Sequence, residues 1–507
     1  MKLRAPRSIL IGSGVLGGIA VLPIVARAQN STASTSSNAD YEPLGIDGSG
    51  TTNPSKCFWH IMSKFNEQIK LPTQFSYRAV GSGTGIKEFL GKGIEIDGVE
   101  SDTYLPYNDF GSGDIPISAE DRSDASSRGI EFVQLPFALS AVSFFHSVPG
   151  VPSGEMGLSE IFNANITTWD DPEILDVNPG LVVERDYPIY VARRILGSSS
   201  TYSVTNYLRA QCPDGWSEDM TGSEIEWHPS TNGCDGSDLM TNCINENEGA
   251  IGYLDAAHGH EELLTEISLR NGDGRFLTSV SAGVEGVQAA VDLALWLNLS
   301  SYSSPYPSCL VSFFSSILRF FFPLANDNPR EKRTYNQKQP GSNTWPITLV
   351  SYVYIRKDLS FIKNPARRTL LKAFATALFD PDYIGLCDRY GIVPAPLALK
   401  QLSIVGLEML ELDASASDDW SFEKDTMPGV GQGDYVISSR RQNFGLYEAD
   451  RLADDLAPLI EEVRQLKLEL ASLKASAYSA SGIAVGGSAA ASLVIGLVVL
   501  AGMAVVN

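Results

Sequence analysis

The hydrophobic and polar positions along the chain repeat one local arrangement, in which a short strand, a loop of small residues and a helix follow one another. Residues 74–80 predict a strand, and residues 81–85 after it are glycine, serine and threonine only. Residues 189–194 predict a second strand, followed by Gly-Ser-Ser-Ser at 197–200 and a helix that begins near Thr201. Each loop therefore leads directly into the N-terminus of a helix.

A third loop of this kind lies earlier in the chain, at residues 48–55. Asn53 and Pro54 suit the N-cap and the first position of a helix. The apolar positions after them keep helical spacing and predict one buried face, formed by Phe58, Ile61, Met62, Phe65 and Ile69.

Helix N-termini of this kind are candidate anion sites. Their first N–H groups have no partner within the helix, and they favour a negative charge. Arg194, just before the loop at 197–200, adds a planar fork of donors that suits an oxyanion. The sequence thus predicts an anion site there, with an ordinary N-cap as the alternative. The glycine spacing at 81–85 matches neither nucleotide-binding pattern, and Asp114, in a Gly-Ser-Gly-Asp turn, is by itself typical of turn chemistry.

Longer apolar segments predict the frame that holds these loops. Residues 131–147 are almost continuously apolar, which is typical of buried strands. Residues 345–356 alternate as a strand does, and residues 248–254 predict a short buried strand. Helices are predicted at 158–174, with a turn at Trp169-Asp170-Asp171-Pro172, and at 364–378.

The C-terminal part has a different character. Residues 411–447 are acidic and aperiodic and predict a linker. A helix predicted at 448–477 repeats apolar positions at spacings of four and three, at Leu452, Leu456, Leu459, Val463, Leu466, Leu470 and Leu473. This heptad pattern fits a coiled coil, and equally an amphipathic helix packed on the globular part. Residues 482–506 carry no charge and predict either a transmembrane helix or the signal for a glycolipid (GPI) anchor.

Composition narrows the functional class. Of the 507 residues, 43% are hydrophobic and 19% are charged, as in globular proteins. The formal net charge of −22 argues against binding nucleic acid through a broad positive surface. Residues 1–28 combine separate basic residues, an apolar segment and an Ala-Arg-Ala site, which predicts a secretory signal peptide, and residues 29–40 predict a flexible leader.

A secreted chain would expose its six cysteines to an oxidising compartment. Cys212, Cys234 and Cys243 lie close in sequence and predict a local disulfide among them, while the full pairing stays open. Their spacing does not suit zinc. Three N-glycosylation sequons begin at Asn30, Asn165 and Asn298.

Seven segments, taken together and in order, resemble the periplasmic phosphate-binding protein of bacterial high-affinity phosphate importers. They are GSGTTNPS (48–55), YRAVGSGTGIKEF (77–89), DFGSGDIPIS (109–118), ITTWDDPEILDVNPGL (166–181), VARRILGSSSTYS (191–203), EGAIGYL (248–254) and WPIT (345–348). The resemblance implies a two-lobed α/β periplasmic-binding-protein (Venus flytrap) fold. Lobe 1 would comprise residues 41–138 and 345–410, and lobe 2 residues 139–344.

The resemblance also implies which residues contact phosphate. Carried over position by position, they are Thr52, Asn53, Ser82, Asp114, Arg194, Ser198, Ser199 and Ser200. The three loops would then face one cleft. An aspartate that steadies the arginine in the family is replaced here by Leu196, which implies a less firmly held Arg194. Residues 300–338 have no counterpart in the family and are either an insertion or a translated intron.

The function implied is binding of inorganic phosphate at the cell surface, for uptake or sensing, without catalysis and without a cofactor or metal. The chain would be secreted and held to the extracellular side of the membrane by its C-terminal segment. Its expected partners are phosphate, the membrane, and a phosphate transporter or a coiled-coil partner. The alternatives are an adhesion or assembly protein that kept the fold without tight phosphate binding, and a surface phosphatase.

Overall fold

The computed structural model describes residues 44–92, 95–96, 99–100, 108–148, 157–179, 181–300, 341–412, 420–423 and 433–480. The predicted signal peptide and leader, residues 301–338 of the unmatched segment and the apolar segment 482–506 lie outside them.

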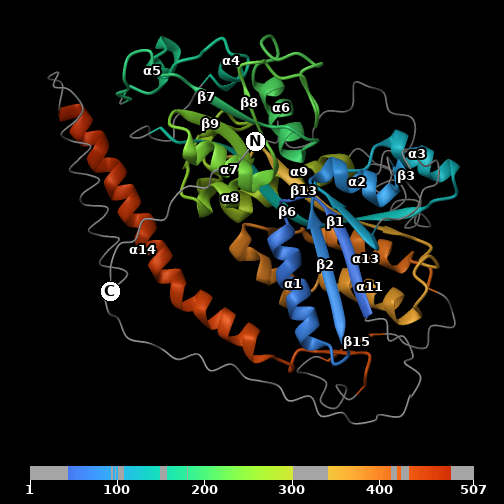
Figure 1. Cartoon of the computed structure of the whole chain (residues 1–507). Coiled ribbons are helices and arrows are strands. Elements are labelled where there is room, and N and C mark those ends of the chain that lie inside the picture. The colour runs from blue at the N-terminus through green and yellow to red at the C-terminus, as the bar shows by residue number, and fades with distance from the viewer. Residues whose placement is uncertain are drawn as a thin grey trace, which may run out of the picture. The chain divides into compact units, whose positions relative to one another are not determined.

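One ten-stranded mixed sheet organises the described fold (Figure 1). Its main path runs β2-β1-β5-β13-β6-β9-β7-β8, and β10 and β14 each pair with β6. The bounds of these strands are β1 Leu44–Gly50, β2 Thr73–Ala79, β5 Phe110–Gly113, β6 Phe132–His146, β7 Tyr190–Arg194, β8 Asn232–Cys234, β9 Ala250–Asp255, β10 Thr265–Glu266, β13 Thr348–Arg356 and β14 Val393–Pro394. Three separate two-stranded sheets pair β3 Glu95–Ile96 with β4 Val99–Glu100, β11 Leu269–Arg270 with β12 Phe276–Leu277, and β15 Ser421–Glu423 with β16 Val436–Ser438.

The long strand β6 joins the two halves of this sheet. It pairs antiparallel with β13 up to Ala141, and from Val142 onward it pairs with β9. Every residue of β6 is buried, which explains the almost unbroken apolar segment in the sequence. Between Ser351 and Tyr352 the register with β13 shifts by one residue, so that β6 carries one extra residue, Phe137. The strand predicted at 131–147 is confirmed.

Two large hydrophobic cores lie on either side of this crossing. One gathers α1, β1, β5, the first part of β6 and α11, with Phe58 against Tyr77, Phe110 and Phe374. The other gathers the second part of β6 with β7, β9 and α6, and holds Trp169, Trp216 and Trp345. A core on each side of crossing strands is the two-lobed α/β arrangement expected from the sequence. The limits of each lobe in the sequence stay a prediction.

The helices follow the predicted pattern in most places. Their bounds are α1 Ser55–Gln68, α2 Ser82–Leu90, α3 Ala119–Ser127, α4 Leu158–Phe162, α5 Pro172–Val177, α6 Ser199–Gln211, α7 Gly236–Glu246, α8 Ala256–Glu261, α9 Ser279–Ser300, α11 Pro365–Ala377, α12 Pro381–Ile384, a 3₁₀ helix Gly385–Tyr390, α13 Leu397–Glu408 and α14 Phe444–Ala480. The predicted helix face of α1 is buried at all five positions, and α11 begins after Asn364, whose side chain caps it.

The helix predicted at 158–174 is wrong. Only the short helices α4 and α5 form there, because Ala164 adopts a positive φ of 58° that ends the first turn. The chain then turns so that Ile166, Trp169 and Ile174 all reach the core without sharing one helix face.

Two disulfides are present among the described residues. Cys234 and Cys243 form the local bridge predicted from their spacing, which joins the end of β8 to α7. Cys57 of α1 is bonded to Cys387 of the 3₁₀ helix, a pairing the sequence left open. Cys212 forms no disulfide within the described part of the chain.

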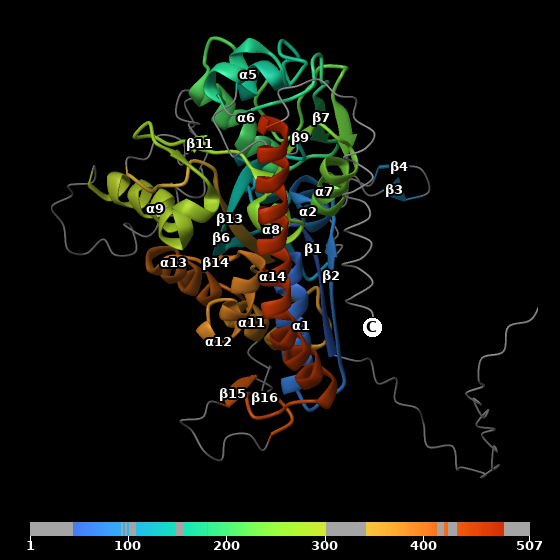
Figure 2. The same ribbon diagram turned by 90° about the vertical axis from the view of Figure 1, so that its left-hand side faces the viewer.

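The segment at 411–447, predicted as a linker from its acidic and aperiodic sequence, contains two short strands. β15 and β16 pair in parallel, and Trp420 and Ile437 are buried in the core beside α1. The chain then continues into α14, whose first turns lie beside the end of α1 (Figure 2). A hydrogen bond from the Asn443 backbone N–H to the Glu67 carboxylate, at 2.5 Å, joins the two helices there. Across the described ranges, no helix combines the length and the apolar character that a membrane crossing requires.

Glycines set the distance between α2 and the sheet. Gly81, just before α2, has a φ of 85°, which favours glycine. A Cβ on Gly85 would lie 2.3 Å from the Cα of Gly50 at the end of β1, so helix and strand touch backbone to backbone. The Gly-Ser-Gly-Thr-Gly loop thus meets a packing requirement as well as presenting a helix N-terminus.

We therefore expect Gly85→Ala to lower the free energy of unfolding by about 1–3 kcal/mol, because α2 would have to move away from β1. Thr84→Ala, in the same turn and only half-buried, is the matched control and should change it by about 0.5 kcal/mol or less. Urea denaturation measures both. Equal losses in the two variants would contradict this account of the close approach.

Candidate anion-binding site

The three loop–helix junctions lie at the carboxyl ends of strands and come together in the fold. β1 precedes α1, β2 precedes α2 and β7 precedes α6. Ligands of α/β proteins gather at such strand ends. The backbone N–H of Gly83 in α2 donates to the carbonyl of Gly197 before α6 at 3.4 Å, so the second and third junctions are in contact. Thr52, at the first junction, lies 3.3 Å from Ser237 at the start of α7.

Asp114 contacts all three junctions. Its Oδ2 accepts hydrogen bonds from the hydroxyl of Thr51 and, at 3.1 Å, from that of Ser199, and its own backbone N–H donates to Ser82 Oγ at 3.2 Å. Its Oδ1 accepts from Ser351 of β13 at 2.6 Å. The side chain comes from the loop after β5 and is only 4% exposed. It therefore lies where both halves of the sheet meet.

The environment of Asp114 favours the protonated carboxyl. Burial raises its pKa to about 7, and the nearby negative charge of Asp255 is the second cause. The three hydroxyl donors act in the opposite direction but do not offset the burial. Tyr77 and Tyr354 also face this carboxyl, and burial raises the pKa of each phenol well above its usual value, so both stay neutral.

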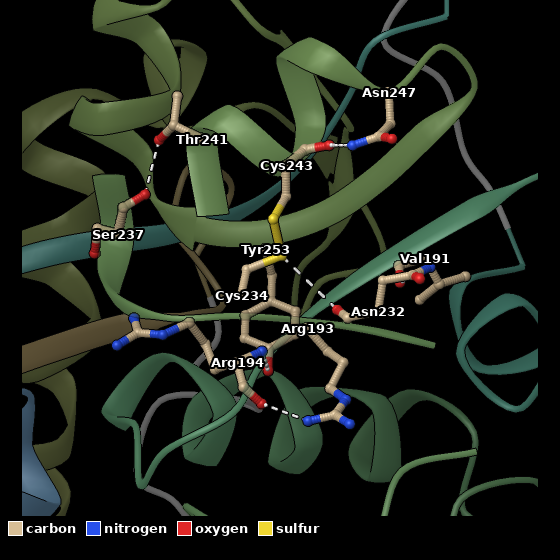
Figure 3. The surroundings of a disulfide bond; sticks show 10 residues. All are labelled: Val191, Arg193, Arg194, Asn232, Cys234, Ser237, Thr241, Cys243, Asn247 and Tyr253. Atoms are coloured by element: carbon tan, nitrogen blue, oxygen red, sulfur yellow. Dashed lines mark hydrogen bonds between the residues drawn. A yellow bond between two sulfur atoms is a disulfide. The ribbon is translucent and has the colours of Figure 1, made fainter. Parts of the chain in front are cut away.

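Arg194 brings the positive charge to the site. It ends β7 and is 5% exposed, and its backbone is fixed by a hydrogen bond from its N–H to the hydroxyl of Tyr253 at 3.2 Å. Within the described residues its guanidinium forms no hydrogen bond or ion pair, and its Nε is buried without a partner. Figure 3 shows that it is directed away from the guanidinium of Arg193, which donates to the Arg194 carbonyl at 3.3 Å.

The absence of an aspartate beside this arginine has a visible consequence. Leu196 is 46% exposed and offers no acceptor. A buried donor without a partner costs roughly 1–3 kcal/mol or more. The guanidinium of Arg194 therefore lacks an acceptor among the described residues, which an external anion would provide.

The remaining predicted residues lie around the same point. Ser198 is the N-cap of α6, and its Oγ accepts from the Thr201 N–H at 3.4 Å, so the capping alternative holds for this residue. Ser199 and Ser200 are buried in the first turn, which begins two residues earlier than predicted. Asn53 is not an N-cap, because its side chain donates to Ser140 of β6 and Pro54 takes the cap position of α1.

Sequence reasoning missed two residues of this site, Ser237 and Asp255. Ser237 lies in the first turn of α7, and its hydroxyl donates to Asp255 Oδ2 at 2.9 Å (Figure 3 shows Ser237). The other oxygen, Oδ1, is buried without a partner. The signal was present: Gly236-Ser237 is a fourth Gly/Ser junction before a helix, and Asp255 directly follows the segment at 248–254.

Chemically, the site offers one unpaired buried cation, several hydroxyls, three helix N-termini and two buried carboxylates. Donors of this kind bind an oxyanion. Carboxylates accept only from a ligand that itself carries a proton. When Asp114 is ionised, at a pH above about 7, the arrangement therefore suits a protonated oxyanion better than a fully ionised one.

Comparison with known proteins agrees with this description. The PBP superfamily domain matches residues 26–381. The phosphate-binding protein PstS of Xylella fastidiosa is 25% identical over 386 residues, which cover 72% of this chain and 90% of that protein. PstS of Haemophilus influenzae is 24% identical over 65% of this chain and 82% of its own.

A solved structure, that of a high-affinity periplasmic phosphate-binding protein (PfluDING) bound with phosphate, superposes with a TM-score of 0.50 at 16% identity. The match covers 71% of this chain and 92% of that one, and it supports the fold. With a domain match over most of its length and the two-lobed architecture described above, the chain belongs to the PBP superfamily.

Proposed function

We propose that the chain binds inorganic phosphate at the junction of its two lobes, and that it is a binding protein rather than an enzyme. The observation that carries the proposal is the contact of Asp114 with all three loop–helix junctions, together with the Arg194 guanidinium, which has no partner among the described residues and lies close to Gly81 at the second junction. Relatives named phosphate-binding proteins and a solved neighbour with bound phosphate support it.

Arg194 supplies the charge in this proposal. Charge-assisted hydrogen bonds from a guanidinium to phosphate oxygens contribute about 1.5–3 kcal/mol each. Hydroxyls and backbone N–H groups of the junctions take the other oxygens, from Thr52, Asn53, Ser82, Ser198, Ser199 and Ser200. The many neutral donors distribute the negative charge of the ligand where water is scarce.

Asp114 supplies selectivity. Its ionised carboxylate accepts a hydrogen bond only from a ligand that still carries a proton. Phosphate does so near neutral pH, whereas sulfate would place two bare anions against each other. Arsenate has the same protons as phosphate and would not be rejected by this device.

A surface phosphatase is not favoured by the residues at the site. Such an enzyme needs an activated nucleophile or a metal cluster. His146 is buried in the second core against Trp169, and burial lowers its pKa to about 3, so it stays neutral as a core residue. The phosphate titration described below separates phosphate binding from the other alternative, an adhesion or assembly protein that does not bind the ligand.

We further propose that the protein acts on the extracellular side and is held there by residues 482–506, as a transmembrane helix or through a GPI anchor. The signal peptide, the sequons and a phosphate transporter as recipient remain part of this proposal. Treating cells with a GPI-specific phospholipase separates the two anchors, because only the lipid-anchored form would be released into the medium.

Isothermal titration of the purified chain with phosphate should give saturable binding, and bound phosphate should raise the melting temperature. Arg194→Ala should weaken binding by about ten- to a hundredfold, since it removes at least one charge-assisted bond. Arg193→Ala is the matched control, because that guanidinium is occupied by Thr231 and the Arg194 carbonyl. No phosphate binding by the native chain would overturn the proposed function in favour of the adhesion alternative.

Replacing the selective carboxylate should relax discrimination. We expect the Asp114→Asn variant to bind sulfate about tenfold more tightly than the native chain does, because the amide that replaces the carboxylate can donate a hydrogen bond to a sulfate oxygen. Asp109→Asn is a suitable control. That buried carboxylate lies outside the predicted site and forms an ion pair with Arg367, with an N–O distance of 2.7 Å. Unchanged rejection of sulfate by Asp114→Asn would remove the assigned role.

Sulfate affinity should also depend on pH in the native chain. The pKa of Asp114 is raised to about 7, so the carboxyl carries a proton below that pH and can then donate to sulfate. Sulfate itself stays fully ionised there, so the change reports on the protein. Affinity should rise as the pH falls through about 7, by about tenfold per unit above it. Asp114→Asn should show no such dependence in competition titrations.

Asp255 should set the position of this transition. Its negative charge raises the pKa of Asp114, so Asp255→Asn should shift the rise in sulfate affinity to lower pH. The amide oxygen can still accept from Ser237, so the local structure is kept. Asp238→Asn replaces an exposed acid of α7 next to Ser237; it is the control and should leave the transition in place.

A further inference from the structure

Helix α14 presents a row of apolar side chains to solvent. Leu452, Leu456, Leu459, Val463 and Leu466 are each 50–57% exposed. They recur at spacings of four and three residues, as neighbours on one side of a helix do. The alternative of an amphipathic helix packed on the globular part would bury this row, and among the described residues nothing covers it.

The row is regular after Pro458. With Leu456, Val463 and Leu470 at heptad position a, and Leu459, Leu466 and Leu473 at d, Pro458 takes position c, away from the seam. A β-branched residue at one a position together with leucine at d is a combination found in two-stranded parallel coiled coils.

Charged residues beside the seam select the partner and its direction. In this register Glu462 and Glu469 occupy g positions, and Lys467 and Lys474 occupy e positions. In a parallel pair, each g residue neighbours the next e residue of the other helix. Glu462 would then meet Lys467 and Glu469 would meet Lys474, while the earlier pair joins Asp455 to Ile460. An antiparallel pair would place glutamates together and lysines together.

We propose that α14 pairs, parallel and in register, with α14 of a second copy of this chain. The apolar row supplies the area, and the alternation of Glu at g with Lys at e makes the helix complementary to itself. Since the regular part, residues 459–473, spans only about two heptads, the pairing is reversible and depends on concentration. This inference does not depend on phosphate binding.

Cysteine cross-linking of the full chain in mild detergent tests the register. Leu459→Cys and Leu466→Cys, each made separately, should both form interchain disulfides under mild oxidation, because equivalent d positions meet in a parallel in-register pair. Gln465→Cys, at the outward c position, is the matched control and should stay largely monomeric, as should the native chain with its unbridged Cys212. Cross-linking at only one of the two d positions, or equally at Gln465, would overturn the proposal.

Charge reversal tests the choice of partner. The double variants Glu462→Lys with Glu469→Lys, and Lys467→Glu with Lys474→Glu, should each sediment as monomers at concentrations where the native chain dimerises. Mixing the two variants should restore a dimer, since these two charged g–e pairs are then attractive again. An unchanged circular dichroism spectrum and an unchanged melting temperature of the lobes confirm that each variant remains folded. Dimers of unchanged stability in either double variant on its own would exclude pairing through α14.

Discussion

The buried carboxyl of Asp114 is the group on which the arrangement of the site depends. Hydroxyls from the first and third loop–helix junctions and from the crossing strand β13 converge on its two oxygens, and Ser82 of the second junction accepts from its backbone. These groups come from both halves of the sheet, so one side chain fixes how the walls of the site face each other. Burial, with the negative charge of Asp255 as the second cause, raises the pKa of this carboxyl to about 7, and the three hydroxyl donors lower it by less.

The positive charge is organised in the opposite way. Arg194 has a fixed backbone, held by Tyr253, and a guanidinium without a partner among the described residues. A salt bridge would steady the guanidinium but would also compete with the ligand for it. With Leu196 at this position, no carboxylate of the described residues competes with an external anion for the guanidinium.

Local patterns in the sequence predicted much of this fold. The apolar patterns of β6, β9 and α11 are easy to recognise in the sequence. β6 and β9 are buried along their whole length and are therefore continuously apolar, and α11 buries one face and therefore repeats apolar residues at helical spacing. The segment at 158–174 misled because Ile166, Trp169 and Ile174 reach the core through turns, which leave no period. Asp255 and Ser237 escaped notice because their relation to Asp114 and Thr52 arises from the strand order, β6-β9-β7, which no local pattern encodes. The strands within the predicted linker at 411–447 were not predicted either, because the few buried residues there are spread over a mainly polar segment.

The extra residue Phe137 in β6 has a mechanical consequence. It lies where the pairing with β13 slips by one residue, next to Ser351, and Ser351 is the donor to Asp114 Oδ1. Any bending of the two halves of the molecule about these crossing strands would act on an irregular pairing, which deforms more easily than a regular ladder. The length of the Ser351–Asp114 bond would change with it. A longer Ser351–Asp114 hydrogen bond would raise the pKa of the carboxyl, because this bond is one of the contacts that lower it.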